Sequence, residues 1–382
     1  MGLGGAAVVG VAFGMARYAY GLTLPSLRSE FGLSELLLGL IASGTFVGYL
    51  IGLVSVPRLS VRRGPRAPTT VGGVCGVVGC ATVALAPSAE VLAAGAVLSG
   101  AAAGWVWAPY SDIVSAVAPR HDQPTLLALI TTGTSVGLVA LAALGVLGAS
   151  TSWRLTWAGI SLAAALAALV NLRTVPRVEA RVRDTDTSPR SLWRRAVVAP
   201  LGYSVLFFAG ITVYFTYASD AAHSGGLATS AAPVLFGLVG VGGLVALSTG
   251  RMTRAVGSPA VGGASVCGVA GALILLGLGR TSLTLVLASA LLFGVGFMVG
   301  SSALAVWTAE VVSDRPGEGF TTALVVGAVT SIAMPAVMGA LIPVLGLPTM
   351  LVLVAAVTAS GAVILPVLPS LGDAAEGRAR RS

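Results

Sequence analysis

The stretch that decides the fold is LGGAAVVGVAFGMARYAYGLTLPSL, residues 3–27. It is apolar and long enough to cross a bilayer, because about 20 such residues span a hydrocarbon core of ~30 Å. It nevertheless contains Arg17, about 21 Å along a helix from Leu3 at ~1.5 Å per residue. A charge at this depth costs roughly 3 kcal/mol on insertion scales, so it normally faces a water-filled cavity or a partner. We therefore interpret this stretch as a membrane span with a functional or a structural arginine.

The composition of the whole chain agrees with this interpretation. Of its 382 residues 56% are hydrophobic and only 9% are charged, and the mean hydropathy is +0.95. A soluble protein carries about 25% charged residues, so a polytopic membrane protein is expected. The net charge of +8 comes from arginine alone, since no lysine occurs. These arginines lie between apolar runs, which favours a topological role over nucleic-acid binding.

Two other features argue against a disulfide framework, a cysteine metal site and a cleavable signal peptide. The three cysteines, Cys75, Cys80 and Cys267, fall inside apolar runs, so we expect packing residues rather than a disulfide framework or a metal site. The first span lacks a basic leader and runs directly into another apolar segment, which argues against a cleavable signal peptide.

Apolar runs separated by short polar breaks predict an all-α fold with twelve transmembrane helices. The expected spans are 3–27, 34–56, 68–87, 89–110, 125–149, 153–171, 199–219, 231–250, 259–279, 283–308, 320–344 and 347–368.

Arginine placement predicts the orientation. If the N-terminus is cytoplasmic, the outside loops hold only Arg28, Arg154 and Arg280, and every other arginine except Arg17 lies inside. This bias follows the positive-inside rule and supports an even number of spans. We expect a multi-pass protein of the cell (inner or plasma) membrane with both termini cytoplasmic.

The chain divides into two similar halves. The polar stretch 172–198 is the expected cytoplasmic linker between six-helix bundles at 1–171 and 199–369, and 370–382 is a cytoplasmic tail. Several residues of the first half recur 194 positions later, and Gly64 meets Gly257 after a slip of one. The recurring pairs are Phe13 and Phe207, Tyr20 and Tyr214, Gly48 and Gly242, Gly100 and Gly294, and Gly133 and Gly327. This predicts two pseudo-symmetric repeats.

The basic segment after the second span carries a family resemblance. PRLSVRRGPR, residues 57–66, resembles the G-x-x-x-D-[RK]-x-G-x-[RK] loop of the major facilitator superfamily. Arg62, Gly64 and Arg66 match it, whereas Pro57 and Val61 replace its first glycine and its aspartate. The charge latch of the family is therefore not carried over intact.

Two further segments support the resemblance less strongly. The run from Ala96, AVLSGAAAG, resembles the family's R-x-L-x-G-x-x-x-G signature without its arginine. The first span, with Arg17, Tyr18, Tyr20 and Pro25, resembles a little-characterised bacterial branch of permeases. The resemblance implies alternating access and a cavity lined by spans one, four, seven and ten.

Arg17 is the leading candidate for contact with a substrate. On a helical wheel it shares a face with Phe13, Tyr20 and Leu24, which we interpret as a wall of the pathway. No carboxylate lies at comparable depth, so Arg17 is predicted to receive an anionic or polar group. A structural arginine bonded to carbonyls or tyrosines is the equal alternative. Aromatic residues on the expected cavity spans complete the predicted substrate site, namely Tyr20, Trp105, Trp107, Tyr110, Phe207, Tyr214, Tyr217 and Trp307.

Charges at the expected cytoplasmic helix ends form a predicted gate. They would pair when the cavity closes to the cytoplasm, and solvated loop charges are the plainer alternative. The gate residues are Arg58, Arg62, Arg63, Asp112, Arg120, Glu310 and Arg315. Coupling to H⁺ through Asp220 or His223 is conceivable. No metal site or other cofactor is expected.

These observations predict a secondary active transporter of a small organic solute. The family resemblance alone implies export of a drug or metabolite rather than import. An uptake permease for an organic anion is the alternative. A membrane-embedded, lipid-acting enzyme is less favoured, because neither a metal motif nor a nucleophile motif occurs. A primary pump would need an ATP-binding loop, which is missing. The expected partners are the substrate and the bilayer, with no nucleic acid, and the chain is predicted to be a monomer.

Overall fold

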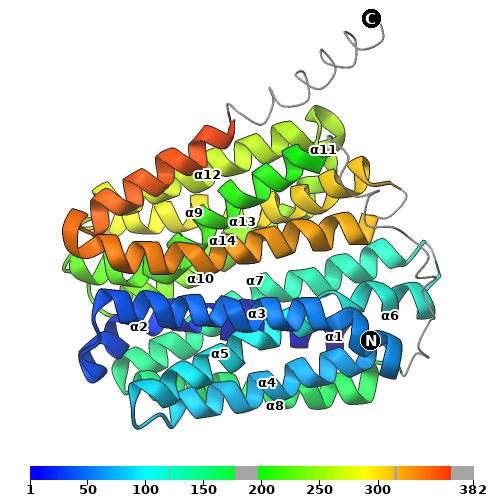
Figure 1. The fold of residues 1–382 in the computed structure, drawn as a ribbon, viewed down its shortest axis with the longest axis horizontal. Coiled ribbons are helices and arrows are strands. Elements are labelled where there is room, and N and C mark those ends of the chain that lie inside the picture. Colours follow the sequence, from blue (N-terminus) through cyan, green and yellow to red (C-terminus); the bar gives the residue numbers. More distant parts are fainter. Residues whose placement is uncertain (120, 177–196, 314–315, 363–382) are drawn as a thin grey trace, which may run out of the picture.

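The computed structural model describes residues 1–119, 121–176, 197–313 and 316–362, and over these ranges the chain forms helices and no strand. The helical segments are α1 (Gly2–Val9), η1 (Gly10–Ala16), α2 (Arg17–Phe31), α3 (Glu35–Arg63), α4 (Arg66–Ala84), α5 (Ala89–Val106), α6 (Pro109–Val117), α7 (Gln123–Ser150), α8 (Trp153–Thr174), α9 (Val198–Ser224), α10 (Ala231–Gly243), η4 (Leu244–Ser248), α11 (Thr249–Val256), α12 (Ser258–Gly279), α13 (Leu283–Val311) and α14 (Pro316–Leu345) (Figure 1). A last helix covers Leu347–Ala362.

The helices match the predicted membrane spans. Eleven helices in the described ranges are long and apolar enough to cross a bilayer, and Leu347–Ala362 is the described part of the predicted twelfth span. The all-α polytopic fold is thus confirmed. Most of the predicted linker, the end of the twelfth span and the tail lie outside the described residues.

The first span contains a segment of π-helix that the sequence did not reveal. Gly2–Phe31 is one continuous rod in which η1 separates α1 from α2, and Arg17 is the first residue after the π-segment. Gly14 lets this segment lie against the backbone of α7, because a Cβ there would be 2.6 Å from the Cα of Gly137. Such π-segments are rare and often mark functional sites.

The second span is longer than predicted. Residues 57–66 were expected to be a loop, but α3 continues through Pro57 to Arg63, and Gly64 and Pro65 alone separate α3 from α4. A membrane helix tolerates a proline because its neighbours satisfy the freed backbone groups. The chain then turns at Gly64, whose φ of 81° favours glycine. Its counterpart Gly257 has a φ of 86°.

Two other spans differ from their prediction. The fourth span breaks after α5 because Pro109, which lacks a backbone N–H, starts the new helix α6. The eighth span runs on to Val256 and changes from α-helix to 3₁₀-helix in η4.

The contacts of the glycines show that the halves are repeats. A Cβ on Gly48 would overlap the carbonyl of Val97, and its counterpart Gly242 lies against the carbonyl of Leu291, 194 positions further on. Gly100 and Gly294 lie in the same way against equivalent carbonyls of α3 and α10. Close backbone approach through glycine is how membrane helices pack. The two halves therefore use the same internal packing.

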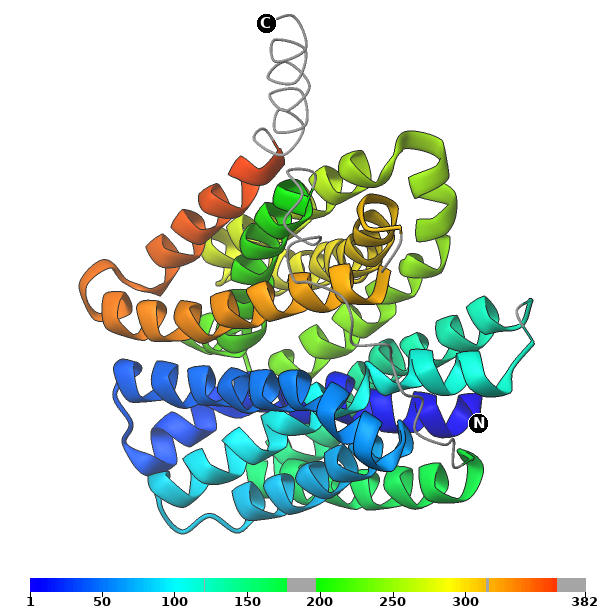
Figure 2. The same ribbon diagram turned by 45° about the vertical axis from the view of Figure 1, so that its right-hand side comes forward.

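The two repeats stack face to face. Helices α1 to α8 form one bundle, and α9 to α14 with the last helix form the other (Figures 1 and 2). We call the end where α3 ends and α9 begins the linker end, and the end that contains residues 32–34 and 225–230 the far end. Gly21 and Phe215, which are equivalent in the two repeats, meet between the bundles, since a Cβ on Gly21 would overlap the Phe215 carbonyl. Equivalent residues meet in this way on a two-fold axis.

Candidate functional site

Arg17 is buried inside an aromatic cage. Its side chain is 8% exposed, and its guanidinium carbon lies 4.1 Å from the ring centre of Tyr49. The rings of Phe46, Phe13 and Tyr18 lie at 5.2, 5.4 and 5.9 Å. All four rings come from the first two spans. Cation–π contacts of this kind contribute up to about 2 kcal/mol each when desolvated, so the cage offsets part of the cost of burial.

The cage does not neutralise the charge. Arg17 makes no ion pair with any carboxylate in the described ranges, and its Nε–H has no hydrogen-bond partner there. A buried donor without a partner costs about 1–3 kcal/mol, and more when the group is charged. One anion bound beside Arg17 would therefore neutralise the buried positive charge.

The predicted pathway face of the first span packs against the second span instead. The Tyr20 hydroxyl donates to the Leu38 carbonyl at 2.8 Å, and Phe13 makes an edge contact with Tyr49 at 6.2 Å. Leu24 is fully buried. In this conformation Phe13 and Tyr20 hold the first two spans together, and a pathway wall at this face stays a prediction.

A stack of aromatic rings between the bundles was not predicted. Tyr18 stacks on Phe215 with ring centres 3.6 Å apart and lies edge-on to Phe297 at 6.1 Å. Phe215 also contacts Phe293 at 5.0 Å. The sequence offered one signal, because Tyr18 stands next to Arg17 within the first-span pattern. Tyr18 therefore joins the first span to the seventh and tenth spans.

Of the three predicted residues near the fourth span, Trp107 makes a ring contact with the other bundle. Its ring centre is 5.1 Å from that of Phe320 at the start of α14. Trp105 lies against Gly72 of α4 within its own bundle. The Tyr110 hydroxyl donates to Oδ1 of Asn171 at 2.7 Å, so it is engaged in a buried polar network.

The predicted residues of the second bundle pack within that bundle. Tyr214 stacks on Phe293 and shares a hydrogen bond with Ser289 at 2.8 Å. The Tyr217 hydroxyl donates to the Pro335 carbonyl at 3.1 Å. Phe207 and Trp307 both pack on Tyr203. In this conformation these four side chains support the bundle rather than line a passage.

The predicted gate residues that the structure describes form no ion pairs with one another. Arg58, Arg62, Arg63 and Asp112 are exposed, and the carboxylate of Glu310 accepts a hydrogen bond from the Ser258 hydroxyl at 2.9 Å. Arg120 and Arg315 lie outside the described residues. The gate stays a prediction, because it concerns a conformation closed at the linker end.

An ion pair joins the bundles at the far end instead. Arg28 of α2 donates to both carboxylate oxygens of Asp220 of α9, at 2.6 and 2.8 Å, and to Glu35 at 2.9 Å. The Asp220 side chain is 3% exposed and that of Arg28 is 30% exposed. A bidentate guanidinium–carboxylate contact is among the strongest polar contacts in proteins. Arg28 was expected in a loop, and Asp220 was considered only for H⁺ coupling.

A second cluster at the far end fixes the first span to its own bundle. Glu30 accepts hydrogen bonds from Trp153 Nε1 at 2.6 Å and from Arg154 at 2.5 Å. Arg154 also donates to the Ala84 carbonyl at 3.0 Å. The end of α2 is therefore tied to α8 through Glu30 and to the other bundle through Arg28.

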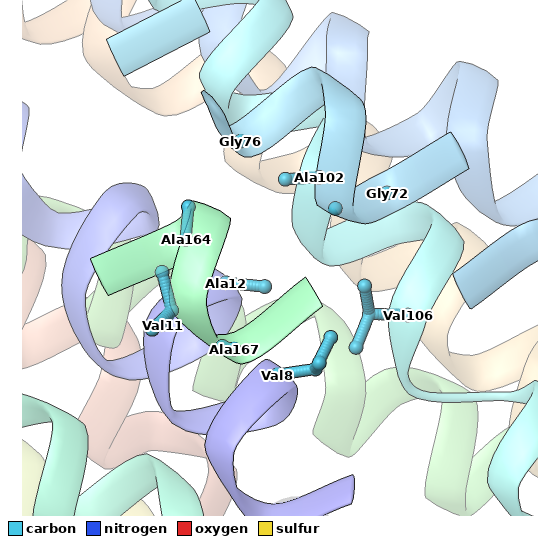
Figure 3. A pocket seen from close by; sticks show the side chains of 10 residues that line it. Val8, Val11, Ala12, Gly72, Gly76, Ala102, Val106, Ala164 and Ala167 are labelled. Atoms are coloured by element: carbon cyan, nitrogen blue, oxygen red, sulfur yellow. The ribbon is translucent and has the colours of Figure 1, made fainter. Parts of the chain in front are cut away.

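Among the hollows in the described part of the chain, two are considered for a site, and one of these is only a packing gap. It lies inside the first bundle, and Figure 3 shows Val8, Ala102 and Val106 around it. Its volume is 10 Å³ for the centre of a water-sized sphere, which is about one water, and glycine, alanine and valine line it. The other, of 190 Å³, lies between α7, η4 and α13, and we call it the seam hollow. Within the described ranges no group of His, Cys, Asp or Glu could hold a metal ion.

A comparison with protein families identifies a match over most of the chain. The model of the Major Facilitator Superfamily matches residues 6–329. This range includes Arg17, the far-end ion pair and the seam hollow.

Solved structures show the same fold at low sequence identity. The xylose transporter XylE from E. coli, in a partially occluded inward-open conformation, is 17% identical, with 94% of this chain and 95% of that one covered and a TM-score of 0.77. The nucleoside transporter NupG, as the D323A mutant, is 13% identical, with 96% and 99% covered and a TM-score of 0.76. A bacterial homologue of the human lysosomal transporter Spinster, inward-facing and occupied, is 15% identical, with 97% and 96% covered and a TM-score of 0.74.

Proposed function

The chain belongs to the Major Facilitator Superfamily, and from this premise we propose that it moves a small organic solute across the membrane by alternating access of its two bundles. It is a membrane transport protein rather than an enzyme. The main observation that supports this mechanism is the bidentate ion pair between Arg28 and Asp220, which joins the two bundles. Because this pair closes the far end only, a rocking motion must break it to open that end.

The arginine distribution supports an orientation for this motion. We place the linker end in the cytoplasm and the protein in the cell membrane, because cytoplasmic segments are rich in arginine. The described conformation is then closed to the outside. Coupling to H⁺ through Asp220 belongs to this proposal as well, since protonation of its carboxylate would weaken the contact with Arg28.

Export of a drug or metabolite was favoured by the family resemblance alone. Uptake of an organic anion is the second candidate, and the unpaired charge of Arg17 favours it. In that case the anion enters the aromatic cage and replaces part of the ring contacts by a guanidinium–carboxylate contact. An aromatic or planar anion fits best, because the cage consists of rings.

The experiment is a thermal-shift screen of metabolites and drugs with the purified protein, followed by transport of the hits in proteoliposomes of known orientation. A ligand raises the melting temperature of the form it binds. We expect an anionic hit whose shift disappears in Arg17→Ala and falls in Arg17→Lys, because lysine keeps the charge but not the planar fork.

Arg251→Ala is the matched control, since Arg251 is exposed at the linker end. It should keep the shift. Equal shifts of the melting temperature in the wild type and in both Arg17 variants would contradict the organic-anion candidate. Alternating access would then be tested by the transport assay alone. That assay also shows the direction of transport.

A further inference from the structure

The seam hollow lies between the two bundles and is open on one side. α7 comes from the first bundle, whereas η4 and α13 come from the second. Its volume of 190 Å³, measured for the centre of a water-sized sphere, is below the ~300 Å³ of a small drug site. It therefore holds one part of a ligand, such as a ring or a short alkyl chain.

Polar groups line the buried side of the hollow. Ser135 is 2% exposed, and its hydroxyl makes no hydrogen bond with any other described residue. Thr131 of α7 and Ser302 of α13 also line the hollow. A hydroxyl that lines a hollow and has no protein partner can hydrogen-bond a polar group of a ligand. No charged residue lines the hollow, so the group that fits there is neutral.

The open side of the hollow is apolar. Leu244 and Leu247 of η4 are 45% and 67% exposed, and Val136 on the neighbouring face of α7 is 62% exposed. Such exposed apolar side chains suit contact with lipid chains. The hollow thus has a rim suited to lipid and a floor that can hydrogen-bond.

The backbone of the eighth span is adapted to this hollow. The α-helix ends at Gly243, and the 3₁₀-helix η4 forms the wall over Leu244–Ser248. A Cβ on Gly243 would lie 2.7 Å from Cγ of Met298 and 2.9 Å from Oγ of Ser135, so any side chain there would fill the space. A stretch of 3₁₀-helix inside a span often marks a hinge or local strain, so the helix changes its geometry next to the hollow.

We propose that the seam hollow is a binding site for a neutral, hydroxyl- or carbonyl-bearing part of an amphipathic solute, which enters from the bilayer between the fifth and eighth spans. The inference rests on the proposed transport function and narrows its substrate class. The solute partitions into lipid, its apolar part passes Leu244 and Leu247, and its polar group hydrogen-bonds Ser135.

Photolabelling tests this site without requiring transport. The probe is octanol with a diazirine on its chain, applied to proteoliposomes, and the modified residues are found by mass spectrometry. We expect labels on the segments around residues 128–135, 243–247 and 298–302. Ala128→Phe and Ala246→Phe fill the hollow and should reduce this labelling about tenfold.

Two further variants make the test specific. Ala143→Phe adds the same bulk at an exposed position of α7 outside the hollow and should leave the labelling unchanged. Ser135→Ala removes one hydroxyl with little change in packing and should reduce labelling about fivefold. Labels elsewhere, or labelling that survives all variants, would overturn the site. A labelled protein that moves no solute would instead count against the transport proposal.

Discussion

The two ends of the molecule meet in different ways. At the far end the bundles touch through backbone, since Gly21 lies against the Phe215 carbonyl and Gly39 against the Pro335 carbonyl. The pair of Arg28 and Asp220 lies at the same end. At the linker end a contact between Trp107 and Phe320 joins the bundles. The predicted gate charges there, Arg58 among them, are exposed.

This difference indicates which contacts determine the conformational equilibrium. Glycine contacts and a partly buried ion pair favour one closed end, and both must be lost when that end opens. If the proposed alternating access is correct, the described structure is one of two states, and the far-end contacts are the ones that stabilise it.

The largest effect should come from Gly21→Val. The added side chain overlaps the Phe215 carbonyl, so the far end can no longer close. Overpacking costs about 1–3 kcal/mol, which would shift the equilibrium roughly tenfold to a hundredfold toward the state that is open at the far end. Labelling of single cysteines at the far end by a membrane-impermeant maleimide measures this shift. Gly263→Val, which adds a side chain in open space, is the control and should label like the wild type.

A smaller shift in the same direction should follow loss of the ion pair. Arg28→Ala and Asp220→Ala each remove an inter-bundle contact, and together they form a double-mutant cycle. Because Arg28 is partly exposed, we expect a coupling energy of about 1–2 kcal/mol. The same maleimide assay gives this value. Strictly additive effects of the two substitutions would mean that the pair does not hold the far end closed.

The smallest effect should come from charge reversal at the linker end. Asp112→Arg changes an exposed residue, so stability should not change. Glu310→Arg also removes the hydrogen bond from Ser258 and should cost about 1 kcal/mol of stability. The population closed at the linker end should fall slightly, because each exposed pair contributes about 0–1 kcal/mol. Cysteine accessibility at the linker end provides the measurement. If neither reversal alters it, these residues are solvated helix-end charges and not a gate.

The sequence predicted the spans and the repeat because both depend on local composition and on glycine positions such as Gly48 and Gly242. It also predicted the buried charge of Arg17, because depth follows from counting residues along a helix. The sequence did not predict which charged residues pair with one another. Arg28 and Asp220 are 192 positions apart, and only the packing of α2 on α9 brings them together.

The aromatic residues show the same limit. Tyr214 was predicted to face the cavity, but its neighbour Phe215 stacks on Tyr18 between the bundles. Every side of a span is apolar, so hydrophobic periodicity cannot tell which side faces the partner bundle. The π-segment before Arg17 also rotates the rest of the span about the helix axis. The residues of η1 contain no signal that predicts a π-helix.

The central claim is that the two ends open in turn, and two distances measured on one sample test it. Spin labels at Leu85 and Leu278 report the far end, and labels at Arg63 and Val256 report the linker end, all four positions being exposed. Pulsed electron–electron double resonance should show that the far-end distance increases and the linker-end distance decreases when Asp220→Asn is introduced. Distances that change in the same sense, or not at all, would contradict alternating access.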